Sequence, residues 1–307
     1  MPVKISIRAS NITKRYGEKT ALDDISFDIA KGELFGFIGP DGAGKTTLFR
    51  ILTTLLIPDK GSASIEGLDT VKEYKKLRKI LGYMPGKFSL YQDLTVEENL
   101  RFFAGIFKTT PEANYDLVKD IYGQIEPFKN RKAGQLSGGM KQKLALSCAL
   151  IHKPEVLVLD EPTTGVDAVS RIEFWEMLAR LRQSGITIVV STPYMDEASR
   201  CDRVALIQNG KIMGIDTPDA IRKDYGRDLW ALKADDIHRL LIDLRQFKAT
   251  RTAFPFGEHI HLSLSDAAVK PDEILLYLQS QGNNNVHISK IEPSIEDCFM
   301  EMMGNSA

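Results

Sequence analysis

The chain has 307 residues with a formal net charge of −1, and 43% of the residues are hydrophobic and 26% charged. This composition is typical of a soluble globular protein of roughly two domains of about 150 residues each, and its balanced charge disfavours a nucleic-acid-binding protein. No apolar run reaches the ~18 residues of a membrane span, MPVKISIRAS contains no apolar leader, and three scattered cysteines predict a reducing, cytoplasmic setting.

The first elements in chain order are predicted strands. Ile5–Ile7 and Ala21–Ile29 alternate apolar and polar residues, as half-buried strands do. The apolar run 34–38 leads into a glycine-rich loop, residues 46–56 predict a helix, and 62–65 predict a short strand. The order strand, loop, helix is the context that the first motif requires.

Residues 39–47 read GPDGAGKTT, which fits the pattern G-x-x-x-x-G-K-[ST]. Glycines let backbone N–H groups turn inward to cradle phosphate, and the following helix adds its free N–H groups and its dipole. Lys45 is expected to reach the β- and γ-phosphates, and the Thr46 hydroxyl to bind Mg²⁺. The predicted phosphate-binding residues are Gly39, Pro40, Asp41, Gly42, Ala43, Gly44, Lys45, Thr46 and Thr47.

The middle of the chain, from about residue 86 to 150, has a helical pattern. Thr95 and Glu98 predict a capping box at the start of one helix, because Glu98 stands three residues after Thr95. Residues 112–125 and 137–152 continue the pattern. We therefore expect a helical subdomain at about 86–150.

A second nucleotide-related pattern is an acidic pair after a buried strand. The apolar run Val156–Leu159 is followed by Asp160 and Glu161. An acid that ends a buried strand lies at the edge of the sheet where ligands bind in open α/β folds. Asp160 is expected to hold Mg²⁺, and Glu161 to polarise the water that attacks the γ-phosphate. Alone the pair also fits two solvated acids, but the phosphate loop favours the catalytic interpretation.

The next elements continue the α/β pattern. Residues 171–183 predict a helix and 186–190 a buried strand. Residues 203–213 predict a hairpin, because Asn209 and Gly210 form a favoured two-residue turn.

The pattern changes near residues 224–226, which predicts two domains, 1–224 and 225–307. The second domain has the order strand, helix, strand, strand, helix, strand, which is typical of a small split-βαβ sandwich. These elements are expected at 229–233, 235–245, 250–254, 259–264, 271–281 and 286–291, with a last helix at 295–303.

A third motif lies in the helical region, where LSGGM places Ser137, Gly138 and Gly139 at the start of a helix. This is a second anion-binding helix N-terminus. Two phosphate-binding ends in one chain make sense if the second binds the nucleotide of another molecule.

The motifs together resemble those of the ABC ATPase family. LSGGMKQK is similar to the family's signature motif, and Lys14-Arg15-Tyr16-Gly17, GPDGAGKTT and LVLDEPTTGVD occur in the family's order over residues 3–220. The tail at 226–307 resembles, by element order, the C-terminal extension of ABC-2 exporter ATPases of the multidrug type. The resemblance implies an α/β P-loop NTPase fold with an antiparallel β subdomain, a helical subdomain and a small α+β C-terminal domain.

The resemblance also implies ATP and Mg²⁺ as cofactors and a role for each motif residue. Tyr16 would stack on the adenine. Asp160 would be the Walker B acid that binds Mg²⁺ with Thr46. Glu161 would be the catalytic carboxylate and Asp167 a dimer contact. The γ-phosphate of the second chain's ATP would be bound by Ser137, Gly138 and Gly139.

The function implied by the resemblance is that of an ATP-binding and ATP-hydrolysing subunit of an ABC transporter, with export as the favoured direction. Its partners would be an integral membrane permease and, in a head-to-tail dimer, a second copy of itself or another ABC ATPase, with no nucleic acid. The expected location is cytoplasmic, peripheral on the inner face of the cell membrane. The groove before Thr95 would be the permease contact.

Two positions depart from the family pattern. The family's glutamine that touches Mg²⁺ and water is replaced by Gly86, and its γ-phosphate histidine by Pro193. Neither replacement offers a polar side chain, and losing a positioned proton-transfer partner typically costs ~10²–10⁴ in rate. We therefore expect the chain to bind Mg-ATP but to hydrolyse it slowly at its own site.

Three other interpretations stay open. Gln92 or a water could replace the missing glutamine and support slow turnover. The chain could be a regulatory ATP-binding subunit without turnover, or a soluble ABC ATPase outside transport. A P-loop kinase or GTPase is disfavoured because it leaves LSGGM unexplained.

Overall fold

The computed structural model describes residues 4–304. The chain divides into two compact units, Met1–Thr217 and Pro218–Ala307. The division lies before helix α7 (Pro218–Lys223), whereas the sequence predicted it at 224–225, because α7 packs against α10 (Ile295–Gly304) of the second unit.

The first unit begins with an antiparallel sheet in the order β2-β1-β4-β5. The strands predicted near residues 5, 21 and 62 are confirmed, and the first two are longer than expected because they pair as one hairpin from Ile5 and Ala30 to Tyr16 and Lys19. The bounds are β1 (Ile5–Tyr16), β2 (Lys19–Ala30), β4 (Lys60–Ile65) and β5 (Leu68–Asp69).

A second sheet has six strands in the order β10-β9-β3-β8-β7-β6. Its strands run parallel except for β10, which pairs antiparallel with β9 through the predicted Asn-Gly turn. The sequence did not predict β6, because four residues are too few to show a period. The bounds are β3 (Leu34–Ile38), β6 (Leu81–Met84), β7 (Val156–Asp160), β8 (Thr187–Thr192), β9 (Arg203–Gln208) and β10 (Lys211–Asp216).

The core of the first unit lies between the two sheets, around helix α1 (Lys45–Leu52). Phe37 of β3 is fully buried and its ring centroid lies 5.0 Å from that of Phe27 and 5.7 Å from that of Phe49. These rings join both sheets and α1 in one cluster. Helix α6 (Ala168–Gln183) packs against β3 and β8 of the six-stranded sheet. Because these strands run parallel, their carboxyl ends lie at one edge of the sheet.

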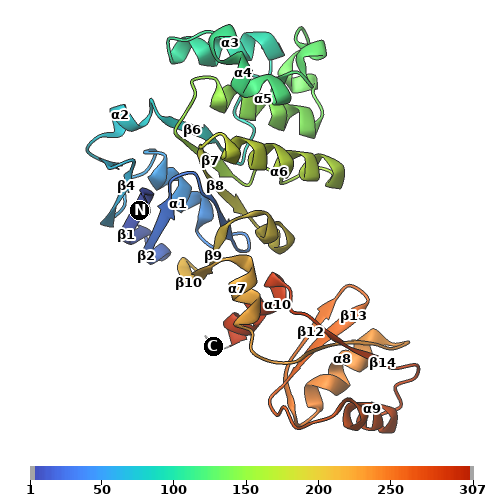
Figure 1. Ribbon diagram of the computed structural model, residues 1–307. Coiled ribbons are helices and arrows are strands. Elements are labelled where there is room, and N and C mark those ends of the chain that lie inside the picture. The colour runs from blue at the N-terminus through green and yellow to red at the C-terminus, as the bar shows by residue number, and fades with distance from the viewer. Residues whose placement is uncertain (1–3, 305–307) are drawn as a thin grey trace. The chain divides into compact units, whose positions relative to one another are not determined.

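The predicted helical region is confirmed and forms its own group of helices, seen at the top of Figure 1. Thr95 and Glu98 make the predicted capping box, since the Glu98 N–H donates to Thr95 Oγ1 and Glu98 accepts from the Thr95 N–H. The longer helices are α3 (Val96–Ile106), α4 (Tyr115–Tyr122) and α5 (Gly138–Leu150), with α2 (Tyr74–Leu77) before them and short 3₁₀ turns at Glu112–Asn114, Glu126–Phe128, Ala133–Gln135 and Met195–Arg200.

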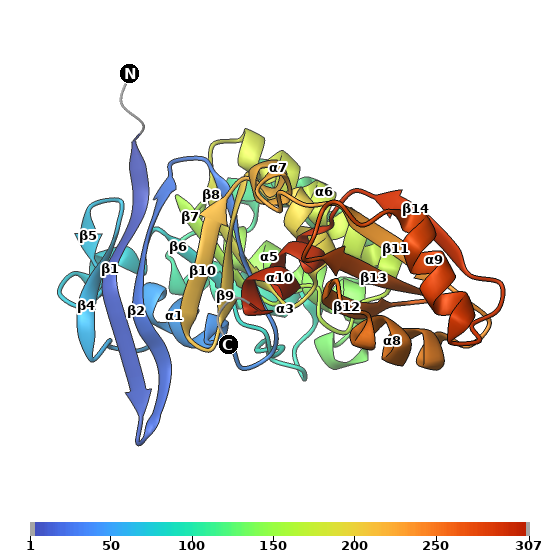
Figure 2. The same ribbon diagram turned by 90° about the horizontal axis from the view of Figure 1, so that it is seen from below.

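The second unit confirms the split-βαβ order. Its four strands form an antiparallel sheet in the order β12-β13-β11-β14, and Figure 2 shows α8 and α9 against this sheet. Leu240 of α8 and Leu278 of α9 are fully buried against the strands. The bounds are β11 (Leu229–Lys233), α8 (Ile237–Gln246), β12 (Thr250–Phe256), β13 (His259–Leu264), α9 (Pro271–Ser280) and β14 (His287–Ile291). No helix within residues 4–304 is long and apolar enough to cross a membrane.

The aromatic cluster around Phe37 predicts a large effect of truncation there. Phe37→Ala should lower the free energy of unfolding of the first unit by about 3–5 kcal/mol, because it leaves a cavity among rings that join both sheets. The measurement is urea unfolding followed by the fluorescence of Trp175 in a Trp230→Phe background. Val169→Ala, at a side chain that is 67% exposed, is the control and should change stability by less than about 0.5 kcal/mol. Equal effects of the two substitutions would contradict this description of the core.

Candidate functional site

The glycine-rich loop joins the carboxyl end of β3 to the start of α1. Gly44 has φ of 109°, a conformation that side chains disfavour. A Cβ atom at Gly39 would lie 2.1 Å from the carbonyl oxygen of Ile207. The loop can therefore keep its shape only with glycine at both positions.

Lys45 is the buried cation of this loop, with 2% of its surface exposed. Its Nζ donates to the carbonyl oxygens of Gly39 at 2.7 Å and Pro40 at 2.9 Å, and lies 3.2 Å from Oε1 of Glu161. The ammonium group is thus folded back across the loop. Phosphate oxygens can replace these oxygen partners without burying an unpaired charge.

Asp160 ends β7 and joins three elements through one oxygen atom. Thr46 Oγ1 donates to its Oδ1 at 3.2 Å, and Ser191 Oγ of β8 donates to the same atom at 2.7 Å. Hydroxyl and carboxylate oxygens are the ligands that Mg²⁺ prefers, so Thr46 and Asp160 fit the expected metal role. Ser191 was not among the predicted site residues. The only feature of the sequence that could have revealed Ser191 is its position, as a polar residue, at the end of an apolar predicted strand.

Glu161 follows in a sharp turn with φ of 49°, which is uncommon outside glycine. Its N–H donates to the carbonyl oxygen and to Oγ of Ser191, at 3.1 and 3.0 Å. The next carbonyl, of Pro162, accepts a hydrogen bond from Gln142 of α5. Such backbone strain costs of order 1–3 kcal/mol and persists only where surrounding contacts fix it. The anchors from β8 and α5 supply such contacts.

A buried carboxylate, Glu197, binds Thr163, which follows this turn, and Thr192, which lies in β8. It is 3% exposed, and its Oε2 accepts from Thr163 Oγ1 at 3.0 Å and from Thr192 Oγ1 at 2.5 Å. Its Oε1 accepts from Arg171 Nε of α6 at 3.0 Å. Sequence reasoning missed this network, because its members are far apart in the chain.

The phosphate loop and Glu161 open into one cavity of about 240 Å³. Tyr16, at the end of the β1–β2 hairpin, lines it and is 48% exposed, so its ring is accessible to a ligand. Sequence reasoning missed two lining residues, Lys19 and Ala21, which lie in β2 and carry no motif. The predicted residues that line the cavity are Tyr16, Gly42, Gly44, Lys45, Thr46, Thr47 and Glu161.

The third motif does not line that cavity. Ser137 caps α5, since its Oγ accepts the N–H of Met140 at 3.3 Å. A Cβ atom at Gly139 would lie 2.9 Å from Ser170 Oγ, so α5 begins close to α6. Asp167 caps α6 by accepting the Ser170 N–H at 3.0 Å, and this hydrogen bond holds the pKa of Asp167 below its usual range. Ser137, Gly138 and Gly139 thus stand apart from the chain's own Lys45.

The two departures from the family pattern lie at the edge of the site. A Cβ atom at Gly86 would lie 3.0 Å from the carbonyl oxygen of Asp160 and 3.8 Å from Cβ of Glu161. Pro193 directly follows β8, whose Ser191 and Thr192 stand beside Asp160 and Ile38 in the sheet. Both positions therefore flank the Asp160–Glu161 pair but offer no side-chain donor.

No histidine within residues 4–304 lines the cavity. The ring of His152 stacks on that of Phe107, with centroids 3.6 Å apart, and its Nε2 lies 2.9 Å from the carbonyl oxygen of Leu81. The other histidines belong to the second unit: His238, His259, His261 and His287.

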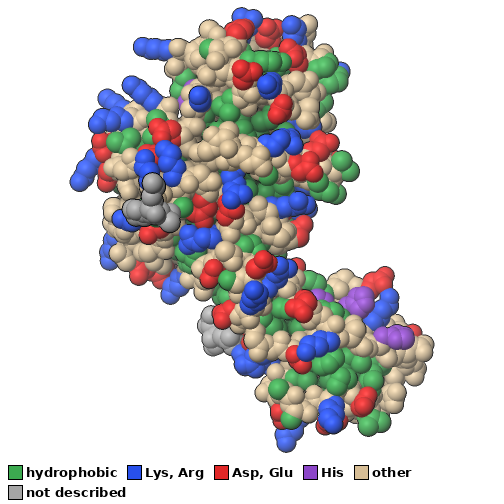
Figure 3. All heavy atoms as spheres, viewed as in Figure 1, with side chains coloured by type: hydrophobic (Ala, Val, Ile, Leu, Met, Phe, Trp, Pro, Cys, Tyr) green, Lys and Arg blue, Asp and Glu red, His purple; other side chains and the backbone are tan. Residues whose placement is uncertain are grey.

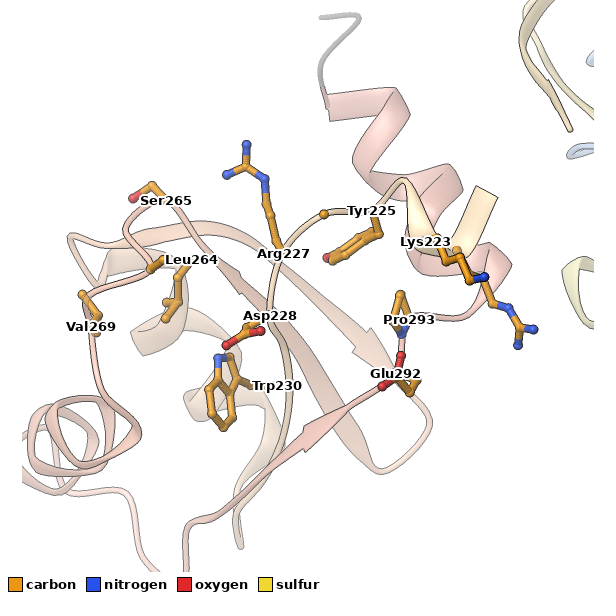
Figure 4. Close-up of a pocket in the computed structure, with 13 residues that line it drawn as sticks. Lys223, Tyr225, Arg227, Asp228, Trp230, Leu264, Ser265, Val269, Glu292 and Pro293 are labelled. Atoms are coloured by element: carbon orange, nitrogen blue, oxygen red, sulfur yellow. The ribbon is translucent and has the colours of Figure 1, made fainter. Parts of the chain in front are cut away.

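A wider cavity of about 610 Å³ lies in the second unit, near the start of β11. Figure 4 shows that the side chains of Lys223 and Arg227 extend away from Trp230, so its polar groups do not converge on one point. The smaller cavity at the phosphate loop, where functional groups meet, is the candidate site.

Comparisons with known proteins show the family of the chain. Residues 22–164 match the family model described as ABC transporter. The chain is 40% identical over 230 residues to the probable multidrug ABC transporter ATP-binding protein YbhF of Escherichia coli strain K12, covering 74% of this chain but only 40% of that relative. It is 36% identical over 308 residues to the Nod factor export ATP-binding protein I of Burkholderia lata, covering 99% of this chain and 98% of that protein.

Among solved structures, the ATP-binding cassette MJ0796, in a dimeric post-hydrolysis state bound to ADP and Pi, has a TM-score of 0.62 and 28% identity. The match covers 69% of this chain and 98% of the cassette. The fold class predicted from the motifs is confirmed. From its sequence, its fold and the geometry around Lys45 and Asp160, this chain belongs to the family of ABC transporter ATP-binding proteins.

Proposed function

We propose that the chain is the ATP-binding subunit of an export-type ABC transporter, and that it binds Mg-ATP at the Lys45 cavity. The observation that carries the proposal is the convergence of Lys45, Thr46, Asp160 and Glu161 at one sheet edge. The relative named as a multidrug ABC transporter protein supports the transporter assignment, and the relative named for Nod factor export supports the direction of export.

Each residue of the site is proposed to contact a different part of Mg-ATP or the attacking water. Lys45 and the loop N–H groups bind the phosphates, and Tyr16 stacks on the adenine. Thr46 and Asp160 hold Mg²⁺, which neutralises phosphate charge when bound. Glu161 orients a water as the proton acceptor. Because Lys45 and Glu161 pair at 3.2 Å in the structure, phosphate binding also frees Glu161 for this role.

A second chain completes the site. Ser137 and the two glycines after it form the N-terminus of α5 outside the chain's own cavity, so they are available to another molecule's ATP. The MJ0796 cassette, which has a similar fold, is dimeric in its ADP- and Pi-bound state and supports such an assembly. The partner is a second copy of this chain or another ABC ATPase.

Hydrolysis at the chain's own site is proposed to be slow. Glu161 is present, but Gly86 and Pro193 leave the attacking water with fewer positioned partners. Lost general acid–base or polar partners cost ~10²–10⁴ in rate, whereas binding rests on the intact loop. If these losses abolish hydrolysis completely, the chain is a regulatory ATP-binding subunit without turnover.

The permease contact is proposed at the start of the helical subdomain. Tyr91 is 50% exposed and Phe102 of α3 is 41% exposed, and their ring centroids lie 4.8 Å apart. An exposed aromatic pair of this kind favours a protein partner. Closure of the two-chain assembly around ATP would reach the membrane partner through this surface. A soluble ABC ATPase outside transport has no comparable observation in its favour.

The first test removes the phosphate-binding cation. Lys45→Ala should weaken Mg-ATP binding by about 10- to 100-fold, because charge-assisted hydrogen bonds contribute ~1.5–3 kcal/mol. Isothermal titration calorimetry measures the affinity, and the unfolding midpoint checks the fold. Lys129→Ala, at an exposed lysine outside the cavity, is the matched control and should leave the affinity unchanged. Unchanged binding in Lys45→Ala would exclude this cavity as the ATP site.

The second test restores the missing side chains. Gly86→Gln combined with Pro193→His should raise steady-state ATP turnover at least about tenfold, because both positions flank Glu161. Phosphate release is the measurement, with Glu161→Gln added to show that the gain depends on the carboxylate. Gly86→Ala is the steric control, since its Cβ meets the Asp160 carbonyl without adding an amide. If the double variant is no faster than the wild type, the impaired-site proposal is wrong.

A further inference from the structure

A short segment around α2 carries a strong excess of positive charge. Residues 71–79 read VKEYKKLRK, with five Lys or Arg residues and one Glu, in a chain whose formal net charge is −1. Figure 3 shows Lys and Arg side chains gathered where Figure 1 places α2. This surface, termed the α2 basic patch, comprises Val71, Lys72, Tyr74, Lys75, Lys76, Arg78 and Lys79. None of these residues belongs to the ATP site.

One buried side chain, that of Leu77, fixes which residues of α2 are exposed. Leu77 is fully buried in the core of the first unit, so the residues around it on the turn point outward. Tyr74 is 38% exposed and Val71 is 40% exposed. The turn of α2 therefore presents its cations on an ordered surface together with an aromatic and an aliphatic side chain.

Most of the charge of the patch is not neutralised by neighbouring acids. Lys76 pairs with Glu73 at 3.0 Å, and Asp69 accepts the backbone N–H of Lys72. Within residues 4–304 no ion pair is found for Lys75 or Lys79. Both residues are exposed, and the Lys75 ammonium lies 5.9 Å from the ring centroid of Tyr74, where it stays accessible to an external anion.

Exposed apolar side chains adjoin the cations. Arg78 donates to Oγ1 and to the carbonyl oxygen of Thr54, at 2.8 and 3.0 Å, which ties α2 to the turn after α1. On that turn Leu55 is 57% exposed and Ile57 is 64% exposed. The guanidinium of Arg78 also lies 5.2 Å from the ring centroid of Tyr74. The exposed apolar residues of this turn are thus tied to the basic patch through Arg78 and Thr54.

We propose that the α2 basic patch binds the anionic phospholipid headgroups of the membrane. Lysines attract an anionic bilayer surface, and a tyrosine with aliphatic neighbours suits the headgroup layer, where one end of a side chain is apolar and the other wet. A nucleic acid would use the same charges but has less use for exposed Leu55 and Ile57. The inference rests on the proposed transporter function, because it names the surface that contacts the membrane beside the permease.

The test is co-sedimentation of the full chain with vesicles of phosphatidylcholine containing 30% phosphatidylglycerol, and with phosphatidylcholine alone. Binding should appear only with phosphatidylglycerol and weaken strongly between 50 and 300 mM NaCl. Lys75→Gln combined with Lys79→Gln should reduce the partition coefficient about 25-fold, since each cation near an anionic surface contributes about fivefold. Tyr74→Ser should cause a smaller loss that persists at high salt.

The matched control is Lys129→Gln combined with Lys248→Gln, which removes the same charge from exposed residues outside the patch. It should leave vesicle binding within about twofold of the wild type. Equal losses in the two double variants, or no preference for phosphatidylglycerol, would overturn the proposal. So would retention on immobilised polyglutamate without vesicle binding, which would indicate an acidic protein partner. Mg-ATP affinity measured in parallel separates the outcomes, because failure of vesicle binding with normal ATP binding rejects the lipid inference alone.

Discussion

The site depends on one oxygen atom, Oδ1 of Asp160, which receives hydroxyl groups from the phosphate loop and from β8. Through this atom the carboxyl ends of β7 and β8 are joined to the start of α1. Thr46 lies in α1, and Ser191 lies in β8. Because buried carboxylates are costly without partners, these hydrogen bonds fix the position of Asp160 and of its neighbour Glu161. The proposed phosphate site and the proposed catalytic carboxylate therefore depend on the same contacts.

The strained turn at Glu161 extends this network to the rest of the first unit. Gln142 of α5 binds the Pro162 carbonyl, and Glu197 binds Thr163. Helix α5, which Ser137 caps, is thus connected directly to the residues that follow Glu161. A change at the start of α5, where a second chain's ATP is proposed to bind, has a short path to the turn at Glu161.

Sequence reasoning reached those parts of the fold and site that depend on neighbours in the chain. The phosphate loop, the acidic pair and the Thr95 capping box each need a fixed local spacing, so the residue pattern reveals them. Ser191 and Glu197 act through contacts between distant segments, and no local pattern distinguishes them from other polar residues. The strand β6 was missed because its four residues show no period, and α7 was assigned to the wrong side of the division because only tertiary packing places it.

In the proposed dimer, Ser137 of a second copy of this chain completes the ATP site at Lys45. The direct measurement is the molar mass of the full chain with Mg-ATP, by size-exclusion chromatography with light scattering, in a Glu161→Gln background that prevents hydrolysis. We expect an ATP-dependent dimer that Ser137→Arg abolishes while the ATP affinity of the monomer is kept. Dimerisation that survives Ser137→Arg, or loss of ATP binding by the monomer of that variant, would contradict it.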